Sequence, residues 1–448
     1  MRHTTTFRRV LICTLALMPV ACSAAVVGSP GPSGSSNPNA TAQASAAAAR
    51  PPDAWLVVGR RGEAGVEVVQ ARTGEREYEL PLGAPTDSKW GELVVATSDG
   101  GQTTVKSLVV QPGFGGGTRV VDGRWRLPTI GDDPVPVGVS FDGSTVVLVE
   151  DTDNSARSTS RFLVLDRSSM FLNSPHPATA QVIELAGSFE FDALSPNGRV
   201  LYVVEHLSTG PAGHYQVRAV DLPAGTLRPE VIVDKRKIGE EMAGWPISQL
   251  RAPDGVVYTL YRGAEHPFVH ALQSADGFAV CIDLPLGDRG LEEDRVIDWG
   301  LAASPDWKSV YAANATVGQV VDIDPGELAI RHSATIKPIA QDPIVLAKFG
   351  HSEGGPIGRR VVVSADGRMA YAAGAEGIVA IKTGDLSVAA RYPSDSAVKA
   401  LGLTPDGATL FALLGDGGRI VAFDTTTGKV VGEVAGSGYD RLLAVMPW

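Results

Sequence analysis

Three common catalytic or metal-binding patterns are missing from this sequence of 448 residues. It has no Cys-x-x-Cys pair, no His-Glu-x-x-His and no Gly-x-Ser-x-Gly between a strand and a helix. These are the usual sequence evidence for a structural zinc site, a zinc protease and a hydrolase with a serine nucleophile. We therefore expect no cofactor, no metal ion and no catalytic residues of these types.

Basic residues are also in short supply. The chain has 39 Lys and Arg against 50 Asp and Glu, which gives a formal net charge of −11 at pH 7. Removal of the first 21 residues would take away three arginines and no acid, so the mature chain is more acidic still. Nucleic acids and anionic membrane surfaces are bound through basic patches, so we expect neither as a partner.

Cysteine is rare, with three in the whole chain. Cys13 lies in an N-terminal apolar segment, Cys22 lies at its end, and Cys281 lies in the strand pattern Phe278–Leu284. If Cys22 carries a lipid, no disulfide can form within the mature chain. Cys281 is then expected to be an inert, buried thiol.

The first 22 residues have the form of an export signal. Three arginines precede the apolar run Val10–Val20, which is too short to span a bilayer. Cys22 follows Ala21, an arrangement that resembles the lipobox of bacterial lipoproteins, although Pro19 stands where that family prefers Leu. The resemblance implies that Cys22 is acylated and that the protein is anchored to the cell membrane, facing outward. In the alternative, a signal peptidase cuts nearby and the protein is secreted.

Residues 23–52 form a low-complexity segment made mostly of Ala, Ser, Gly, Pro, Asn and Thr. Such a composition cannot bury enough apolar area to offset the entropy lost on ordering. As a flexible coil it would span roughly 30 Å. We predict that it is a disordered linker between the anchor and a globular domain at residues 53–448.

The stretch Phe189–Val233 contains the unit that most of the chain repeats. Ser195-Pro-Asn-Gly198 is a tight-turn signal between two apolar runs, which predicts a β-hairpin. The second run, Val200–Val204, is apolar at nearly every position, so both faces of its sheet are expected to be buried. Small antiparallel sheets packed face to face around an axis form a β-propeller.

The turn signal recurs at intervals of 40 to 60 residues, and an apolar run follows it each time. Such intervals suit blades of four strands. The recurrences are Ser140–Gly143, Ala252–Gly255, Ser304–Trp307, Ser364–Gly367 and Thr404–Gly407. A second turn is expected between the third and fourth strands of some blades, at Thr73-Gly74, Thr383-Gly384 and Asp424–Lys429.

The pattern predicts an all-β fold, a single propeller of eight four-stranded blades, with seven as the alternative if Glu92–Leu127 merges with its neighbour. Three strands precede Trp90, so we predict that Leu442–Met446 completes the first blade and closes the ring. A short helix is possible within Asp234–Trp245. The other blades are predicted at Glu92–Leu127, Val135–Ala186, Phe189–Val233, Ile247–Leu284, Val296–Ile336, Arg359–Tyr392 and Val398–Val434.

Three motifs that suggest ligand sites are better interpreted as loops. In Glu265–His270, two histidines on a strand would lie roughly 13 Å apart, too far to share one metal ion. Asp151–Asn154 lacks the later Gly and Glu of a calcium loop. Gly113–Gly117 is not followed by a helix pattern, which a phosphate-binding loop requires.

Polar residues gather on comparable loops of two neighbouring blades. These loops are expected on one rim of the ring, where propellers usually bind ligands, although ordinary loop polarity explains them as well. The candidate binding residues are Glu205, His206, His214, Tyr261, Arg262 and His266.

The Ser-Pro-Asp/Asn-Gly turns followed by Leu-Tyr-Val, together with Asp424–Lys429, resemble the bacterial surface propellers of the YVTN and WD40-like groups. Shorter stretches resemble uncharacterised exported proteins of high-GC bacteria. These resemblances imply the fold and no assigned activity. The shorter stretches are Gln111–Gly115, Trp125–Thr129, Phe191–Pro196 and His266–Leu272.

Two hypotheses for function remain open. In the first, the propeller is a binding scaffold at the cell surface for a protein, peptide or glycan ligand. It would act as a monomer that touches the membrane only through its lipid. In the second, it is a lactonase-like hydrolase with a site in the central channel. The fold does not choose between them.

Overall fold

A computed structural model describes residues 52–447, apart from 61–62, 64, 87–89, 111–114, 132, 134, 153–157, 171–179, 208–213, 233–241, 264–265, 287–298 and 340–358. The signal at residues 1–22 and nearly all of the linker at 23–52 therefore lie outside the described residues. Much of the helix predicted within Asp234–Trp245 does so as well, and its described part, Met242–Trp245, is a strand.

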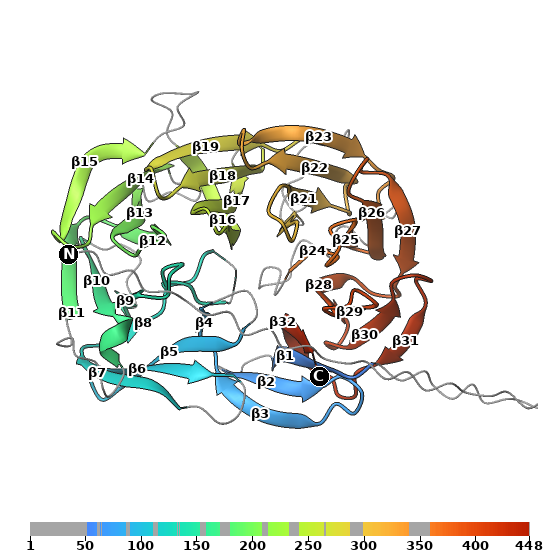
Figure 1. The fold of residues 1–448 in the computed structure, drawn as a ribbon, viewed down its shortest axis with the longest axis horizontal. Coiled ribbons are helices and arrows are strands. Elements are labelled where there is room, and N and C mark those ends of the chain that lie inside the picture. The colour runs from blue at the N-terminus through green and yellow to red at the C-terminus, as the bar shows by residue number, and fades with distance from the viewer. Residues whose placement is uncertain are drawn as a thin grey trace, which may run out of the picture. The chain divides into compact units, whose positions relative to one another are not determined.

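The described strands form eight antiparallel units of four strands, which we call blades one to eight in chain order (Figure 1). Blade one contains β1 (Ala54–Arg60), β2 (Gly65–Gln70), β3 (Arg76–Pro81) and β32 (Tyr439–Pro447), and blade two contains β4 (Ala84–Pro85), β5 (Glu92–Asp99), β6 (Gln102–Val109) and β7 (Gly115–Asp122). Blade three contains β8 (Trp125–Arg126), β9 (Thr145–Glu150), β10 (Thr159–Asp166) and β11 (Ala180–Ala186), and blade four contains β12 (Phe189–Leu194), β13 (Val200–His206), β14 (His214–Asp221) and β15 (Thr226–Ile232).

Blades five to eight follow the same order of strands. Blade five contains β16 (Met242–Arg251), β17 (Val256–Gly263), β18 (Phe268–Gln273) and β19 (Phe278–Asp283), and blade six contains β20 (Gly300–Ala303), β21 (Val310–Asn314), β22 (Gln319–Asp324) and β23 (Ala329–Thr335). Blade seven contains β24 (Val361–Val363), β25 (Met369–Gly374), β26 (Gly377–Lys382) and β27 (Val388–Pro393), and blade eight contains β28 (Val398–Leu403), β29 (Thr409–Leu414), β30 (Ile420–Asp424) and β31 (Val430–Glu433).

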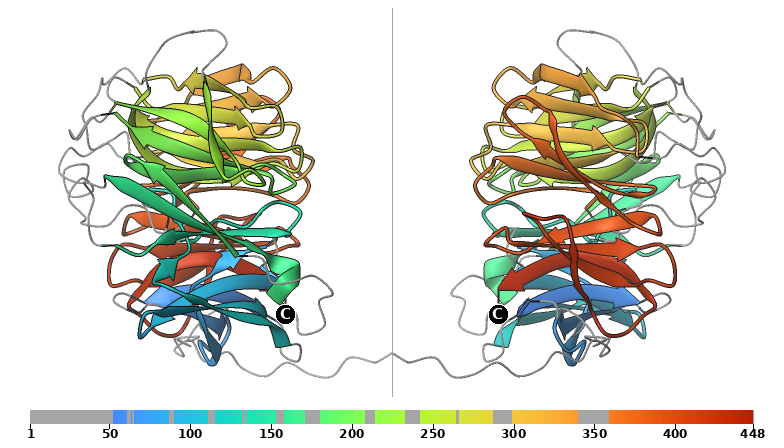
Figure 2. Two further views of the ribbon diagram at one scale, coloured as in Figure 1. Left: turned by 90° about the vertical axis from the view of Figure 1, so that its left-hand side faces the viewer. Right: turned by 90° about the vertical axis from the view of Figure 1, so that its right-hand side faces the viewer.

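The blades surround a central axis, so the fold is the predicted all-β propeller (Figure 1). The count of blades is eight. Blades four and five share one eight-stranded sheet, because the start of β14 pairs with the start of β16. The sheets are strongly twisted, as the side views show (Figure 2). Among the described residues the only helical element is the short 3-10 helix η1 (Arg167–Met170), and none is long and apolar enough to cross a membrane.

The predicted turns of the first kind lie between the first two strands of their blades, and in blade eight side-chain hydrogen bonds hold the turn. In blade eight, Asp406 Oδ1 accepts hydrogen bonds from Thr404 Oγ1 at 2.6 Å and from the N–H of Ala408 at 3.0 Å. Thr404 Oγ1 in turn accepts the N–H of Thr409 at 3.0 Å. The donated hydroxyl holds the pKa of Asp406 below its ordinary value. The turn is thus built by side chains that stand within five residues of one another.

The C-terminal strand joins the first blade as predicted. β32 pairs antiparallel with β1 and becomes the inner strand of blade one. Hydrophobic clusters lie between successive blades, including blade eight with blade one and blade one with blade two. Leu56 and Phe411, from blades one and eight, are fully buried in the first of these clusters. Burial on both faces of each sheet explains the continuous apolar runs.

Three details of the prediction were wrong. Ala84–Pro85 is a fourth strand before Trp90, and it is the first strand of blade two. Trp125–Arg126 begins blade three instead of ending blade two. Gly115–Gly117 is part of strand β7 instead of a loop. A side chain at Gly116 would meet the carbonyl of Ser107, so glycine there lets two strands approach closely.

Candidate functional site

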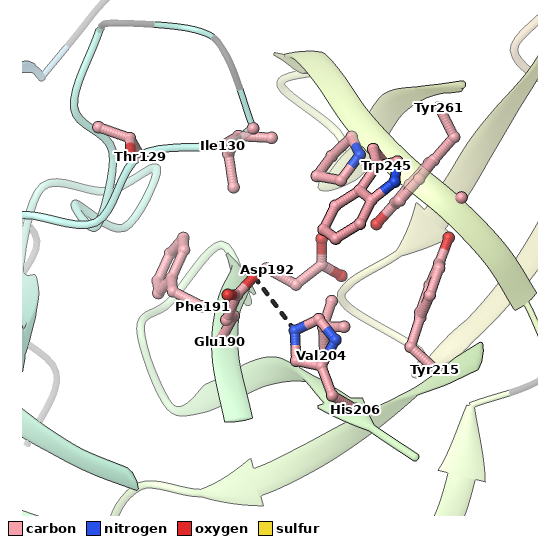
Figure 3. Close-up of a pocket in the computed structure, with 13 residues that line it drawn as sticks. Thr129, Ile130, Glu190, Phe191, Asp192, Val204, His206, Tyr215, Trp245 and Tyr261 are labelled. Atoms are coloured by element: carbon pink, nitrogen blue, oxygen red, sulfur yellow. Dashed lines mark ion pairs between the residues drawn. The ribbon is translucent and has the colours of Figure 1, made fainter. Parts of the chain in front are cut away.

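The structure brings two of the six candidate binding residues together in one pocket between blades four and five (Figure 3). They are His206, at the end of β13, and Tyr261, in β17. The pocket is also lined by Thr129–Gly131, by Glu190–Asp192 of β12, by Val204, by Tyr215 of β14 and by Gly244–Pro246 of β16.

The structure places Glu205 away from this pocket. Side chains alternate along a strand, so Glu205 and His206 point to opposite faces of β13. Glu205 Oε2 accepts hydrogen bonds from Gln216 Nε2 at 2.7 Å and Arg218 Nη1 at 2.9 Å. Its carboxylate is therefore held by the sheet of blade four.

The remaining three candidates do not line the pocket either. His214 is exposed at the start of β14, and His266 is half-buried just before β18. Arg262 is half-buried in β17, opposite Trp245 of β16 in the strand register. Of the six residues expected on one rim, two line the pocket, and the other residues of the pocket lining were not predicted.

A β-bulge in β12 positions the main acidic residue of the pocket. The register runs from Phe191 opposite Val203 directly to Ala193 opposite Tyr202, which leaves Asp192 as the extra residue. Phe191 packs toward blade three, whereas Ala193 packs toward blade five. The bulge therefore reverses the alternation of the strand, a change that typically redirects a side chain beside a functional site.

Asp192 is buried and incompletely paired. It is 2% exposed, and its Oδ2 has no hydrogen-bond partner among the described residues. Its backbone carbonyl accepts a hydrogen bond from Gln249 Nε2 at 3.0 Å. Burial raises the pKa of Asp192 from 3.8 to about 7. Near neutral pH this carboxyl group therefore exists in both protonation states.

A second acidic group lies at the mouth of the pocket. Glu190 Oε2 stands 3.3 Å from His206 Nε2, and the side chain of Glu190 is 68% exposed. The pair is the dashed contact in Figure 3. One carboxyl group is thus buried inside the pocket and the other faces solvent beside a histidine.

Aromatic rings form much of the remaining wall. Tyr215 and Tyr261 stack with ring centroids 5.4 Å apart, and Tyr261 stacks on Phe268 at 5.0 Å. Burial raises the pKa of both phenols well above 10, so both stay neutral. The Trp245 ring lies beside Asp192 (Figure 3), and Trp245 is 48% exposed. Its half-exposed indole forms the rim of the pocket.

The backbone of two further segments completes the pocket. β16 has a register shift between Pro246 and Ser248, which bends the strand beside Trp245. The segment after β8 approaches β16 of blade five, where a side chain at Gly131 would stand 1.8 Å from the carbonyl oxygen of Pro246. Gly131 also has a φ of +52°, so this position favours glycine both because it lacks a side chain and because it tolerates a positive φ.

The composition of the pocket restricts its chemistry. The cavity volume is about 30 Å³, enough for about two water molecules or one small polar group. Its lining includes two acids and one histidine, and no lysine or arginine occurs among the residues that line it. Within the described parts of the chain, no three His, Cys, Asp or Glu side chains gather closely enough to hold a metal ion.

Sequence reasoning missed Asp192, although a signal was present. Phe189 and Phe191 pack toward blade three, and strict alternation would send Leu194 the other way, but Leu194 packs with them. The apolar residues of Phe189–Leu194 thus switch from every second position to adjacent positions, and this interruption of the alternation marks the bulge. The segment Thr129–Gly131 and Trp245 carry no comparable signal, because their part in the pocket depends on contacts across blades.

The remaining histidine and cysteine of this region are close together. His270 is buried in β18, and its Nδ1 stands 3.8 Å from Cys281 Sγ of β19. Cys281 is half-buried, so the expected burial of its thiol is only partial. The T-shaped contact of His270 with Tyr261, at 6.2 Å, supports the aromatic wall from behind.

Comparisons with known proteins support the fold alone. No protein-family model matches the sequence, and the search of curated proteins finds no relative. Among solved structures, AztD from Citrobacter koseri matches with a TM-score of 0.52 and 12% identity, over 87% of this chain and 97% of that chain. Apo AztD from the same organism matches at 0.51 and 11%, over 87% and 98%. Dihydro-heme d1 dehydrogenase NirN in complex with DHE has a TM-score of 0.49 and 14% identity, over 88% and 74%.

Proposed function

We propose that this protein is an exported, lipid-anchored β-propeller that binds a ligand at the cell surface, in the pocket between blades four and five. The observation that carries the proposal is the carboxyl group of Asp192, which is buried with Oδ2 unpartnered among the described residues. A buried polar atom without a partner destabilises a fold by roughly 1–3 kcal/mol. A ligand that supplies the missing hydrogen bond accounts for its presence.

The location of the pocket supports the same function. It lies where two blades share one sheet, and β-bulges in both inner strands bend the backbone around it. Polar groups from β12, β13 and β14 converge there. Convergent polar groups in a largely apolar pocket are the usual form of a small-ligand site.

The anchored location rests on the N-terminal sequence. The apolar run Val10–Val20, then Ala21 and Cys22, resembles a lipobox, and the linker at 23–52 would hold the propeller off the membrane. We expect the wild-type protein in the membrane fraction of producing cells, labelled by a fatty-acid analogue. A Cys22→Ala variant should lose the label and appear in the medium. A Cys281→Ala variant is the matched control and should stay anchored; a labelled Cys22→Ala protein would contradict the anchor.

Ligand binding is tested by thermal shift of the purified full chain against a library sorted by charge. We expect at least one charge class to raise Tm for the wild type and for a Glu205→Gln variant, and not for Asp192→Asn. Glu205 is a suitable control because it is a carboxylate of the neighbouring strand that faces away from the pocket. If every compound that stabilises the wild type also stabilises Asp192→Asn, this pocket is not the binding site.

A hydrolase is the second candidate, and one observation favours it. Asp192 has a pKa of about 7 and lies in one pocket with Glu190 and His206. A carboxyl group that titrates near neutral pH can act as a general acid, with a second carboxylate as base. Turnover of a lactone panel, lost in Asp192→Asn and kept in Glu205→Gln, would favour catalysis over simple binding.

A further inference from the structure

We infer that the pocket between blades four and five takes the ammonium group of a small amine or of a lysine side chain, an inference that rests on the proposed binding function. The unpaired carboxylate oxygen of Asp192, the aromatic wall and the lack of lysine and arginine in the described lining carry it together. Each of the three restricts the ligand in a different way.

The charge of the lining selects the sign of the ligand. Glu190 and Asp192 both border the pocket, and none of its described lining residues is a lysine or an arginine. An anion placed there would meet two carboxyl groups, and His206, the one described lining residue that can carry a positive charge, is already paired with Glu190. Burial of Asp192 strengthens the repulsion. A cation would restore the balance at Asp192. The formal net charge of −11 also favours the approach of cations from solution.

The hydrogen-bonding groups select the kind of cation. Asp192 Oδ2 is buried and has no hydrogen-bond partner within the described part of the chain, and the buried Tyr215 hydroxyl has the Tyr261 hydroxyl as its neighbour. A carboxylate accepts only, and a phenol oxygen can accept as well. A primary ammonium group has three N–H donors, so it can serve both oxygens at once. Its bond to the carboxylate would be charge-assisted and therefore strong.

The rings suit the carbon atoms next to the ammonium group. Trp245 stands at the rim beside Asp192, with Phe191 and Tyr261 also in the wall (Figure 3). Aromatic rings attract cations and pack well against the methylene groups attached to them. A sodium ion has no such carbon atoms, and it prefers more oxygen ligands than these.

The volume of the pocket limits the size of the group that can enter it. A volume of about 30 Å³ holds an ammonium group and about one carbon atom, with the remaining chain directed past the exposed indole of Trp245. A free alkylamine and the end of a lysine side chain present the same group to such a space. The shared chemistry is therefore a primary ammonium group on a short alkyl chain.

The test is isothermal titration of the purified full chain at pH 8 with ethylammonium chloride and, separately, with Nα-acetyl-lysine amide. Ethanol, sodium chloride and sodium acetate are the comparison probes. We expect one or both ammonium probes to bind the wild type and the Glu205→Gln variant with equal affinity. Binding to Asp192→Asn should be at least about tenfold weaker, because a charge-assisted hydrogen bond is lost.

The two arms distinguish the sources of the ammonium group. Binding of ethylammonium points to a free amine, and binding of the lysine amide alone points to a lysine side chain. Binding of acetate or ethanol that depends on Asp192 would overturn the ammonium inference and leave the proposed binding function standing. Equal binding of ammonium probes to wild type and Asp192→Asn would overturn both. If no ammonium probe binds, the inference fails, and the charge-sorted library decides the proposed function separately.

Discussion

Two groups of three aromatic rings lie between neighbouring blades of the propeller, and one hydroxyl group in each has a different environment. Between blades four and five, Tyr261 stacks with Tyr215 and Phe268. Between blades seven and eight, Tyr392 stacks on Phe423 with ring centroids 6.0 Å apart, and its ring is tilted against that of Tyr371 at 6.2 Å. The hydroxyl of Tyr392 donates a hydrogen bond to the carbonyl of Thr425 at 2.6 Å. That of Tyr215 has no such partner among the described residues.

The backbone explains the difference between the two groups of rings. In blade seven the inner strand β24 pairs with β25 without a register shift, and its residues Val361 and Val362 are buried apolar groups. In blade four the inner strand β12 has a bulge that places Asp192 among the rings. Aromatic stacking between blades is therefore part of the architecture. A site arises where a bulge adds a carboxyl group that the fold leaves unpaired.

The largest expected difference between the two regions is in how the free energy of unfolding depends on pH, because Asp192 lies in one of them. The pKa of Asp192 is about 7 in the folded chain and near 3.8 when unfolded. Between these pH values the folded state holds a proton that the unfolded state has lost, so stability falls as pH rises. The difference corresponds to roughly 4 kcal/mol. Urea unfolding from pH 4 to pH 8 should show this fall for the wild type, and a flatter profile for Asp192→Asn.

The other titratable groups near Asp192 are Glu190, His206, Tyr215 and Tyr261 of the pocket lining, together with Tyr202, and the variant retains all of them. Asp406 in blade eight is the control, since hydrogen bonds hold its pKa below the ordinary value. Its contribution is present above the ordinary pKa and is lost as pH falls through the lowered one. Asp406 therefore titrates below the measured range, and Asp406→Asn should leave the slope between pH 4 and pH 8 unchanged. Equal slopes for wild type and Asp192→Asn between pH 4 and pH 7 would contradict the assignment.

The next largest effect is expected when one glycine from each region is replaced by alanine. Gly131 and Gly407 both have positive φ, at +52° and +71°, and an alanine there costs roughly 1–2 kcal/mol. A side chain at Gly407 would meet nothing within 4 Å, whereas one at Gly131 would stand 1.8 Å from the carbonyl oxygen of Pro246. We expect Gly407→Ala to destabilise the fold modestly in urea unfolding and to leave ligand binding unchanged. Gly131→Ala should destabilise it more and also weaken binding; equal effects on binding would show that Thr129–Gly131 does not cover the pocket.

The smallest effect comes from removing one hydroxyl from each group of rings. Tyr392→Phe removes the donor to the Thr425 carbonyl and should lower the free energy of unfolding by about 1 kcal/mol. Tyr215→Phe removes a hydroxyl that bonds to no carbonyl there and has only the Tyr261 hydroxyl as a described neighbour, so stability should change less. Urea midpoints of the two variants provide the measurement. A loss for Tyr215→Phe as large as that for Tyr392→Phe would show that the two groups of rings are built alike.

Much of the fold was predictable because its determinants are local. The turn Thr404–Gly407 is held by hydrogen bonds among residues within five positions of one another. The adjacent run Thr409–Leu414 is buried at every position, which the sequence shows directly. Ala84–Pro85 and Trp125–Arg126 were missed because strands of two residues have no periodicity to detect.

The candidate site was predictable only in part. His206 and Tyr261 were found because they are polar or aromatic residues at strand ends of neighbouring blades. Glu205 was grouped with His206 by closeness in sequence, although neighbours on a strand face opposite ways. Asp192 was passed over because its importance comes from burial without a partner, a property that depends on segments from three blades.

The sequence by itself determined the repeated four-stranded unit, the turns within it and the return of the last strand to the first blade. Those features follow from alternation, turn chemistry and apolar runs, all of which act over a few residues or a single sheet. Only the tertiary structure decided where the pocket lies. The pocket depends on a one-residue bulge at Asp192, on the pairing of β14 with β16 and on the approach of Gly131 to Pro246. Contacts between blades set the last two of these features, and no local pattern of residues encodes such contacts.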